Sequence, residues 1–131
     1  MRYLLDTSAL VQVLRGPGSA VESHLRRLSP EDVGVPAVVM HELYYGAYRS
    51  ARAEANLALV EEIGLPVVEL SREDAREAGR IRAHLAAAGR PIGPFDVLIA
   101  GQAVARGLTL VTGNVGEFAR VDGLAIQDWS G

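Results

Sequence analysis

The chain has 131 residues and a mass of 14.0 kDa, enough for one domain with its own hydrophobic core. Hydrophobic residues make up 49% and charged residues 22%, which excludes a disordered chain, and the absence of cysteine excludes disulfide scaffolds, zinc-thiolate sites and thiol nucleophiles. The formal net charge of −3 does not favour a broadly basic nucleic-acid surface. No apolar stretch is long enough to span a bilayer, so we expect a cytoplasmic protein without membrane attachment.

Short apolar segments alternate with helical ones along the chain. We expect strands over 2–6, 32–35, 67–70, 108–112 and 124–127. We expect helices over 7–14, from about 19 to 28, from Pro36 through Ala47, over 51–63, 71–88 and 95–106. Strands separated by helices indicate βαβ units. The sequence therefore predicts a single three-layer α/β domain over 1–131, with a mostly parallel sheet of four to five short strands covered by helices.

Polar residues follow two of the expected strands. Asp6, Thr7 and Ser8 come after the first, and Thr112 and Asn114 come after the fourth. Ligand sites of open parallel sheets lie at the carboxyl ends of the strands, so these residues form one polar cluster if the two strands are neighbours. The alternative is that Asp6 only caps the helix that follows it.

Two further acids occur inside helices. Glu42 lies beside the apolar stripe of its helix, where the alternative is a simply solvated carboxylate. His41 and Glu42 resemble the start of a zinc motif, but the second histidine one turn later is missing. Asp96 begins a helix that is apolar nearly all round and therefore buried. Its alternative role is a favourable charge at the helix N-terminus, but a partly buried carboxylate needs a partner, and a metal ion is one.

These acids form a set of oxygen donors, together with Asn114 and Glu117. Oxygen ligands without cysteine or paired histidines suit Mg²⁺ or Mn²⁺. Crowded carboxylates raise one another's pKa unless a cation neutralises them. Such a site is suited to hydrolysis of a phosphodiester, in which one or two metals activate water and shield the leaving oxygen.

Four segments and the tail resemble PIN-domain ribonucleases of the VapC type, the toxins of VapBC toxin–antitoxin pairs. They are Leu5-Asp6-Thr7-Ser8-Ala9-Leu10, Glu42-Leu43-Tyr44-Tyr45-Gly46, the segment 91–100, the segment 110–118 and the tail 120–129. The resemblance implies an endoribonuclease dependent on Mg²⁺, with Mn²⁺ as a substitute. It implies that Asp6 and Asp96 bind metal directly, that Glu42 holds metal or water, and that Thr7, Ser8 and Thr112 support them by hydrogen bonds. The family often has an acid where Asn114 stands, so the resemblance gives Asn114 and Glu117 a shared and weaker fourth role.

The resemblance also implies partners. These are an RNA substrate (a transfer RNA or a ribosomal RNA loop), a second copy of the chain in a homodimer, and a VapB-type antitoxin whose tail lies across the acidic groove. Operator DNA is bound only through the toxin–antitoxin complex. Two alternatives remain: a degenerate PIN domain that binds without cutting, and another metal-dependent phosphohydrolase. A haloacid-dehalogenase-like enzyme needs a second Asp two residues after Asp6, where Ser8 stands.

Overall fold

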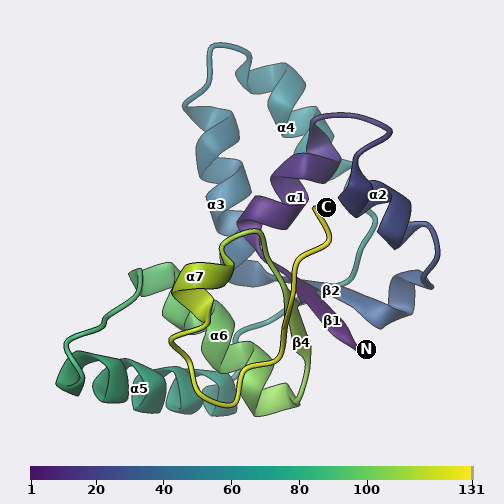
Figure 1. Ribbon diagram of the computed structural model, residues 1–131. Helices are drawn as coiled ribbons and strands as arrows, with labels where there is room; N and C mark the ends of the chain where they lie inside the picture. The colour runs from purple at the N-terminus through teal and green to yellow at the C-terminus, as the bar shows by residue number, and fades with distance from the viewer. Residues whose placement is uncertain (131) are drawn as a thin grey trace.

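Figure 1 presents the computed structural model, which describes residues 1–130. Its strands are β1 (Tyr3–Leu5), β2 (Val33–Pro36), β3 (Val67–Val68), β4 (Thr109–Val111) and β5 (Ile126–Gln127). They form one sheet in the order β3-β2-β1-β4-β5, and every neighbouring pair is parallel. The first strand therefore lies at the centre, where Leu4 is opposite both Gly34 and Leu110. The predicted three-layer α/β fold with a parallel sheet is confirmed.

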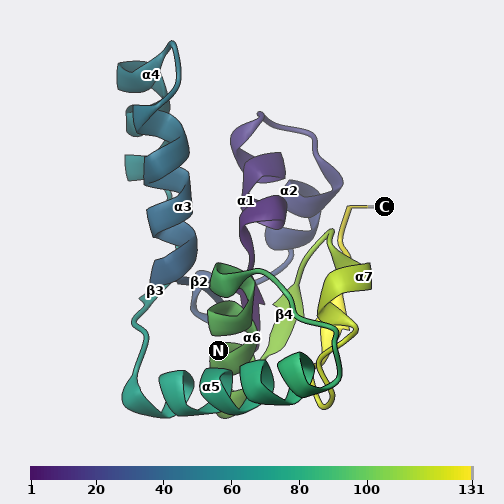
Figure 2. The same cartoon turned by 90° about the vertical axis from the view of Figure 1, so that its left-hand side faces the viewer.

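Helices cover both faces of this sheet. They are α1 (Thr7–Leu14), α2 (Ala20–Leu25), α3 (Ala37–Tyr48), α4 (Ala53–Glu61), α5 (Arg72–Ala87), α6 (Pro94–Arg106) and α7 (Val115–Phe118). Crossovers between parallel strands are right-handed. The chain moves outward from β1 to β3 and then returns to β4 and β5, so α1–α4 belong to one face and α5–α7 to the other. Figure 2 shows α3 and α4 side by side, extending beyond the sheet as a helical hairpin.

The predicted elements exist, but several of their ends were wrong. The strands are shorter than expected. Pro36 ends β2 instead of lying in the first turn of the next helix, because its ψ of 140° is extended, and α3 starts at Ala37. A 3₁₀ turn at Pro30–Asp32 and the helix α7 were not predicted. Each spans only one turn, which is too short to produce a helical hydrophobic period.

The packing of α5 against α6 determines where α6 begins. Ile99, Ala100 and Ala103 of α6 are fully buried. Gly101 faces α5 so closely that a Cβ atom there would lie 2.5 Å from the backbone nitrogen of Ala78. No side chain fits in that space, so the glycine lets the two helix backbones touch. The position of α6 is thereby fixed against both the sheet and α5, with Asp96 in its first turn.

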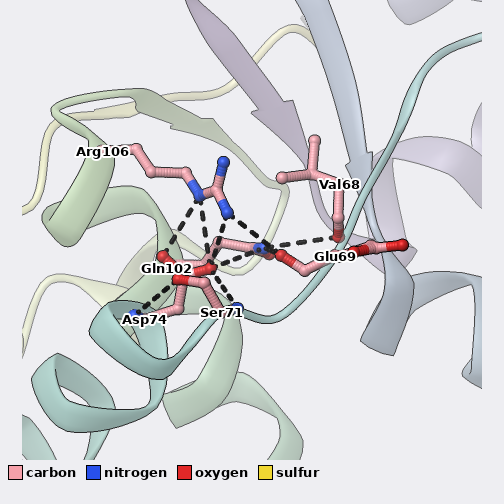
Figure 3. Close-up of polar contacts among 6 residues, drawn as sticks. All are labelled: Val68, Glu69, Ser71, Asp74, Gln102 and Arg106. Atoms are coloured by element: carbon pink, nitrogen blue, oxygen red, sulfur yellow. Dashed lines mark hydrogen bonds and ion pairs between the residues drawn. The ribbon is translucent and has the colours of Figure 1, made fainter.

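A buried ion pair anchors the opposite end of α6 (Figure 3). Asp74 is 1% exposed and accepts hydrogen bonds from Arg106 Nε and Nη2, the latter at 2.9 Å. Its Oδ2 also accepts from Gln102 and from the backbone N–H of Ser71, and the latter bond belongs to a capping box at the start of α5. Burial acts to raise the pKa of Asp74, but the bonds from Arg106 and Ser71 outweigh it and lower that pKa.

No helix within residues 1–130 is long and apolar enough to cross a membrane.

Candidate active site

Asp6 lies at the carboxyl end of the central strand, immediately before α1. Its Oδ1 accepts hydrogen bonds from the backbone N–H of Ala9 at 2.9 Å and from Ser8 Oγ at 2.6 Å. Its Oδ2 accepts from Thr112 Oγ1 at 2.5 Å, and the residue as a whole is 4% exposed. Asp6 therefore caps α1 and also belongs to a polar cluster with Thr112, so both roles considered for it in the sequence are present in the structure.

The end of β4 supplies the other half of this cluster. Because β1 and β4 are hydrogen-bonded neighbours, Thr112 lies next to Asp6, as the sequence predicted. Ser8 Oγ accepts from the backbone N–H of Gly113 at 3.0 Å, and Thr112 Oγ1 accepts from the backbone N–H of Asn114 at 2.9 Å. The cluster is thus a closed network that holds the two strand ends in register, and it leaves the Asp6 carboxylate with a fixed orientation.

Glu42 reaches the same region from α3. Its side chain is half-buried, and its Oε1 accepts a hydrogen bond from Thr7 Oγ1 at 3.0 Å. Thr7 is the residue directly after Asp6. The bond therefore ties α3 to the start of α1, and Glu42 is not a simply solvated carboxylate.

Asp96 and Glu117 meet around Gly93, a residue that sequence analysis had not selected. Glu117 Oε1 accepts from the backbone N–H of Gly93 at 2.8 Å, and its Oε2 accepts from Asn114 Nδ2 at 2.6 Å. A Cβ atom on Gly93 would lie 3.1 Å from Asp96 Oδ2 and 3.7 Å from Glu117 Oε1. Both carboxylates consequently share the space beside this glycine. The only sequence signal was its position in the Pro91–Pro94 turn before the acid.

The charges of these acids act on one another. Burial and then repulsion from Glu117, Glu42 and Asp6 raise the pKa of Asp96 to about 6. The pKa of Glu117 moves the other way, chiefly because the Gly93 N–H stabilises its ionised form. The ionised form of Asp96 is therefore disfavoured first by burial and then by its acidic neighbours.

The donors are those that a hard divalent cation requires, since all are carboxylate, amide or hydroxyl oxygens. Within residues 1–130, however, no three histidine or acidic side chains converge as a ready-made metal site. Asp6, Glu42 and Glu117 each point instead at the hydroxyl and N–H partners described above. Burial and the neighbouring carboxylates raise the pKa of Asp96, and a cation bound among these oxygens would favour its ionised form. The residues fit a divalent cation by chemistry and proximity, with side-chain rotation needed to close around it.

A mostly apolar groove opens beside the acids, between α1, α3 and α4. It has a volume of about 440 Å³. Thr7 and Glu42 line the end nearest the acids, and Val11, Leu43 and Leu59 line its walls. Its polar end and apolar walls suit a peptide segment that combines charged and apolar side chains.

A parallel α/β fold with carboxylates gathered at the carboxyl edge of its sheet defines a class of metal-dependent phosphodiesterases. The chain belongs to one family of that class, the PIN domain, which matches residues 3–124.

Named relatives and solved structures agree with this assignment. The chain is 39% identical to a tRNA(fMet)-specific endonuclease VapC from Shigella flexneri, with 99% of each chain covered. It is 36% identical to the tRNA(fMet)-specific endonuclease VapC of Salmonella typhimurium, with 98% of each covered. Among solved structures it is similar to DNA-bound VapBC from Salmonella typhimurium, with a TM-score of 0.93 at 35% identity and 98% of each chain covered. Rickettsia felis VapBC2 bound to a promoter DNA fragment gives a TM-score of 0.91 at 29% identity, with 98% of this chain and 99% of that chain covered. Within the PIN family the chain therefore groups with the VapC ribonucleases.

Proposed function

We propose that this protein is a Mg²⁺-dependent endoribonuclease, the toxin of a toxin–antitoxin pair acting in the cytoplasm. The observation that carries the proposal is the proximity of Asp6, Glu42 and Glu117 to the half-buried Asp96, whose pKa is raised to about 6 by burial and then by repulsion from these three acids. Asp6, Glu42 and Asp96 are the proposed metal-binding residues. Asn114 and Glu117 complete the site, and Mn²⁺ is the expected substitute because it takes the same oxygen ligands.

The chain's own residues orient this site. Ser8 and Thr112 hold the two oxygens of Asp6, and Thr7 holds Glu42, so these hydrogen bonds orient the carboxylates before a cation binds. Once bound, the metal would lower the pKa of a water molecule and stabilise the departing oxygen. The N–H of Gly93 keeps Glu117 ionised, so that it can orient the attacking water by accepting a hydrogen bond from it.

Transfer RNA is the proposed substrate class, and initiator tRNA is the first candidate. Support comes from the two relatives named tRNA(fMet)-specific endonuclease, which match nearly the full length of this chain. The related VapBC complexes also support a VapB-type antitoxin as partner, and operator DNA as a ligand of the complex. We assign the antitoxin's apolar segment to the groove between α1, α3 and α4, with a basic side chain reaching toward Glu42. A homodimer is the proposed assembly.

Cleavage of purified tRNA tests the proposal. The antitoxin-free protein is incubated with total tRNA in Mg²⁺, in Mn²⁺ and in EDTA, and cut sites are mapped by primer extension. Asp6→Asn is the test variant, because an asparagine oxygen still caps α1 while the charge is lost. Asp122→Asn is the matched control, since this carboxylate is 91% exposed and takes no part in the acidic cluster.

Metal-dependent cutting is expected from the parent protein and from Asp122→Asn, and not from Asp6→Asn. Absence of cutting by a folded, antitoxin-free protein with any metal would refute the nuclease and leave a non-catalytic PIN binding module.

A further inference from the structure

Three large aromatic side chains are exposed on α3 and at the start of α6, the helices that carry Glu42 and Asp96. Phe95 is 44% exposed, Tyr45 is 59% exposed and Tyr48 is 69% exposed. Phe95 contacts His41 edge to face, with the ring centroids 5.5 Å apart and the planes at 65°. His41 directly precedes Glu42, and Phe95 directly precedes Asp96, so this ring pair lies at the border of the acidic site.

The exposed side of α3 continues away from this pair. His41, Tyr45 and Arg49 are each four residues apart, which places them along one side of the helix over about 12 Å. The Arg49 guanidinium lies 5.5 Å from the centre of the Tyr45 ring, and Arg49 Nη1 donates to the tyrosine hydroxyl at 3.3 Å. The arginine therefore fixes the orientation of Tyr45 while its remaining N–H groups face solvent. We name Phe95, His41, Tyr45 and Arg49 the aromatic row.

The composition of the aromatic row fits single-stranded nucleic acid. Proteins that bind single strands combine aromatic rings, on which bases stack, with arginines that contact phosphates. The row begins at the acids, where a cleaved phosphodiester must lie, and the chain has a net charge of −3, so phosphate attraction alone is a weak source of affinity. Stacking supplies affinity that does not depend on charge.

We propose that the aromatic row is the substrate-binding subsite for unpaired RNA bases flanking the cut. Bases stack on Phe95 and Tyr45, and Arg49 contacts a phosphate of the same strand. This assignment rests on the proposed ribonuclease function and extends it. It requires the RNA to be bound as an unpaired loop, because bases inside a duplex are already stacked and their faces are not accessible to aromatic side chains.

Binding, measured apart from cleavage, tests the subsite. The Asp6→Asn protein is titrated into a fluorescein-labelled 12-nucleotide single-stranded RNA in Mg²⁺, and the change in anisotropy gives Kd. Phe95→Leu and Tyr45→Leu are added to it singly, beside the aromatic replacements Phe95→Trp and Tyr45→Phe. Leu70→Ala is the control, because Leu70 is a 38% exposed apolar residue before α5, outside the row. Thermal unfolding of each variant verifies folding, which is expected because the changed side chains are exposed.

Each leucine variant is expected to weaken binding about 5- to 100-fold, the loss that follows from removing one base–aromatic stack. The aromatic replacements and Leu70→Ala keep the parent Kd, and a fully paired duplex binds all variants equally. Equal single-strand binding by parent and leucine variants, or no single-strand binding by the parent, overturns the subsite. A changed oligomeric state in light scattering with unchanged RNA binding also overturns it and assigns the face to a second copy of the chain. Because no turnover is required, failure of the subsite is distinguishable from failure of the nuclease.

Discussion

The burial of Asp96 and the repulsion from its acidic neighbours predict that Asp96→Asn makes the metal-free protein more stable. An acid whose pKa is higher in the folded state than in the unfolded chain costs stability once it ionises. For Asp96 the cost develops as the pH rises from about 4 to about 6 and stays constant above that. The rise of the Asp96 pKa from 3.8 to about 6 corresponds to about 3 kcal/mol of folding free energy, because a pKa difference of one is worth about 1.4 kcal/mol. Asp96 is partly exposed, so solvent screening lowers the expected gain to about 1–3 kcal/mol.

The measurement is thermal unfolding in EDTA at pH 4 and at pH 7.5. Parent and Asp96→Asn are expected to differ little at pH 4 and to separate at pH 7.5, with the variant melting about 3–5 °C higher for each kcal/mol gained. Excess Mg²⁺ should reverse the order at pH 7.5, because a ligand at a hundred times its Kd stabilises the parent by about 2.7 kcal/mol. Asp122→Asn, which removes a surface charge outside the acidic cluster, should show neither effect. The reasoning is refuted if Asp96→Asn is no more stable than the parent in EDTA at pH 7.5.

Three more outcomes follow from contacts described above. Arg106→Met leaves the buried Asp74 carboxylate without its cation and is expected to cost about 3–5 kcal/mol in urea unfolding, and a double variant with Asp74→Asn should recover much of it. Because the pKa of Asp74 is lowered, this stabilisation is present above about pH 4 and fades on further acidification; a loss that persisted at pH 2 would contradict the assignment. Gly101→Ala should lower stability by about 1–3 kcal/mol through overlap with α5, whereas Gly79→Ala, in open space on α5, should raise it by up to about 1 kcal/mol. Thr112→Val removes the donor to the acidic cluster and should reduce Mg²⁺ affinity about 10- to 100-fold by calorimetry, with unchanged affinity arguing against its supporting role.

The order of elements and the edge of the sheet that carries the acids were predictable from the sequence. Apolar runs that end in Asp6 and Thr112 mark the carboxyl ends of buried strands, and parallel pairing then brings them together. The one-turn helix α7 was not predictable, because four residues carry no periodicity. Nor was the role of Gly93, whose backbone N–H contacts Glu117 across 24 residues of chain. The Asp74–Arg106 ion pair was not predicted either, because the two residues are 32 positions apart in the sequence and nothing local to either one indicates the other.

Strand order has a consequence for the protein during its synthesis. The central strand β1 is synthesised first, whereas its neighbour β4 is among the last segments to be synthesised. Asp6 therefore acquires its hydrogen bond from Thr112 only after a further 106 residues have been added. At about 5–20 residues per second, ribosomes need about 5–20 s to cover that distance. During this time the nascent chain has neither the complete five-stranded sheet nor the complete acidic cluster. A chain that ends before residue 112 has neither the pairing of β1 with β4 nor the hydrogen bond from Thr112 to Asp6, so this part of the site forms only when translation is almost complete.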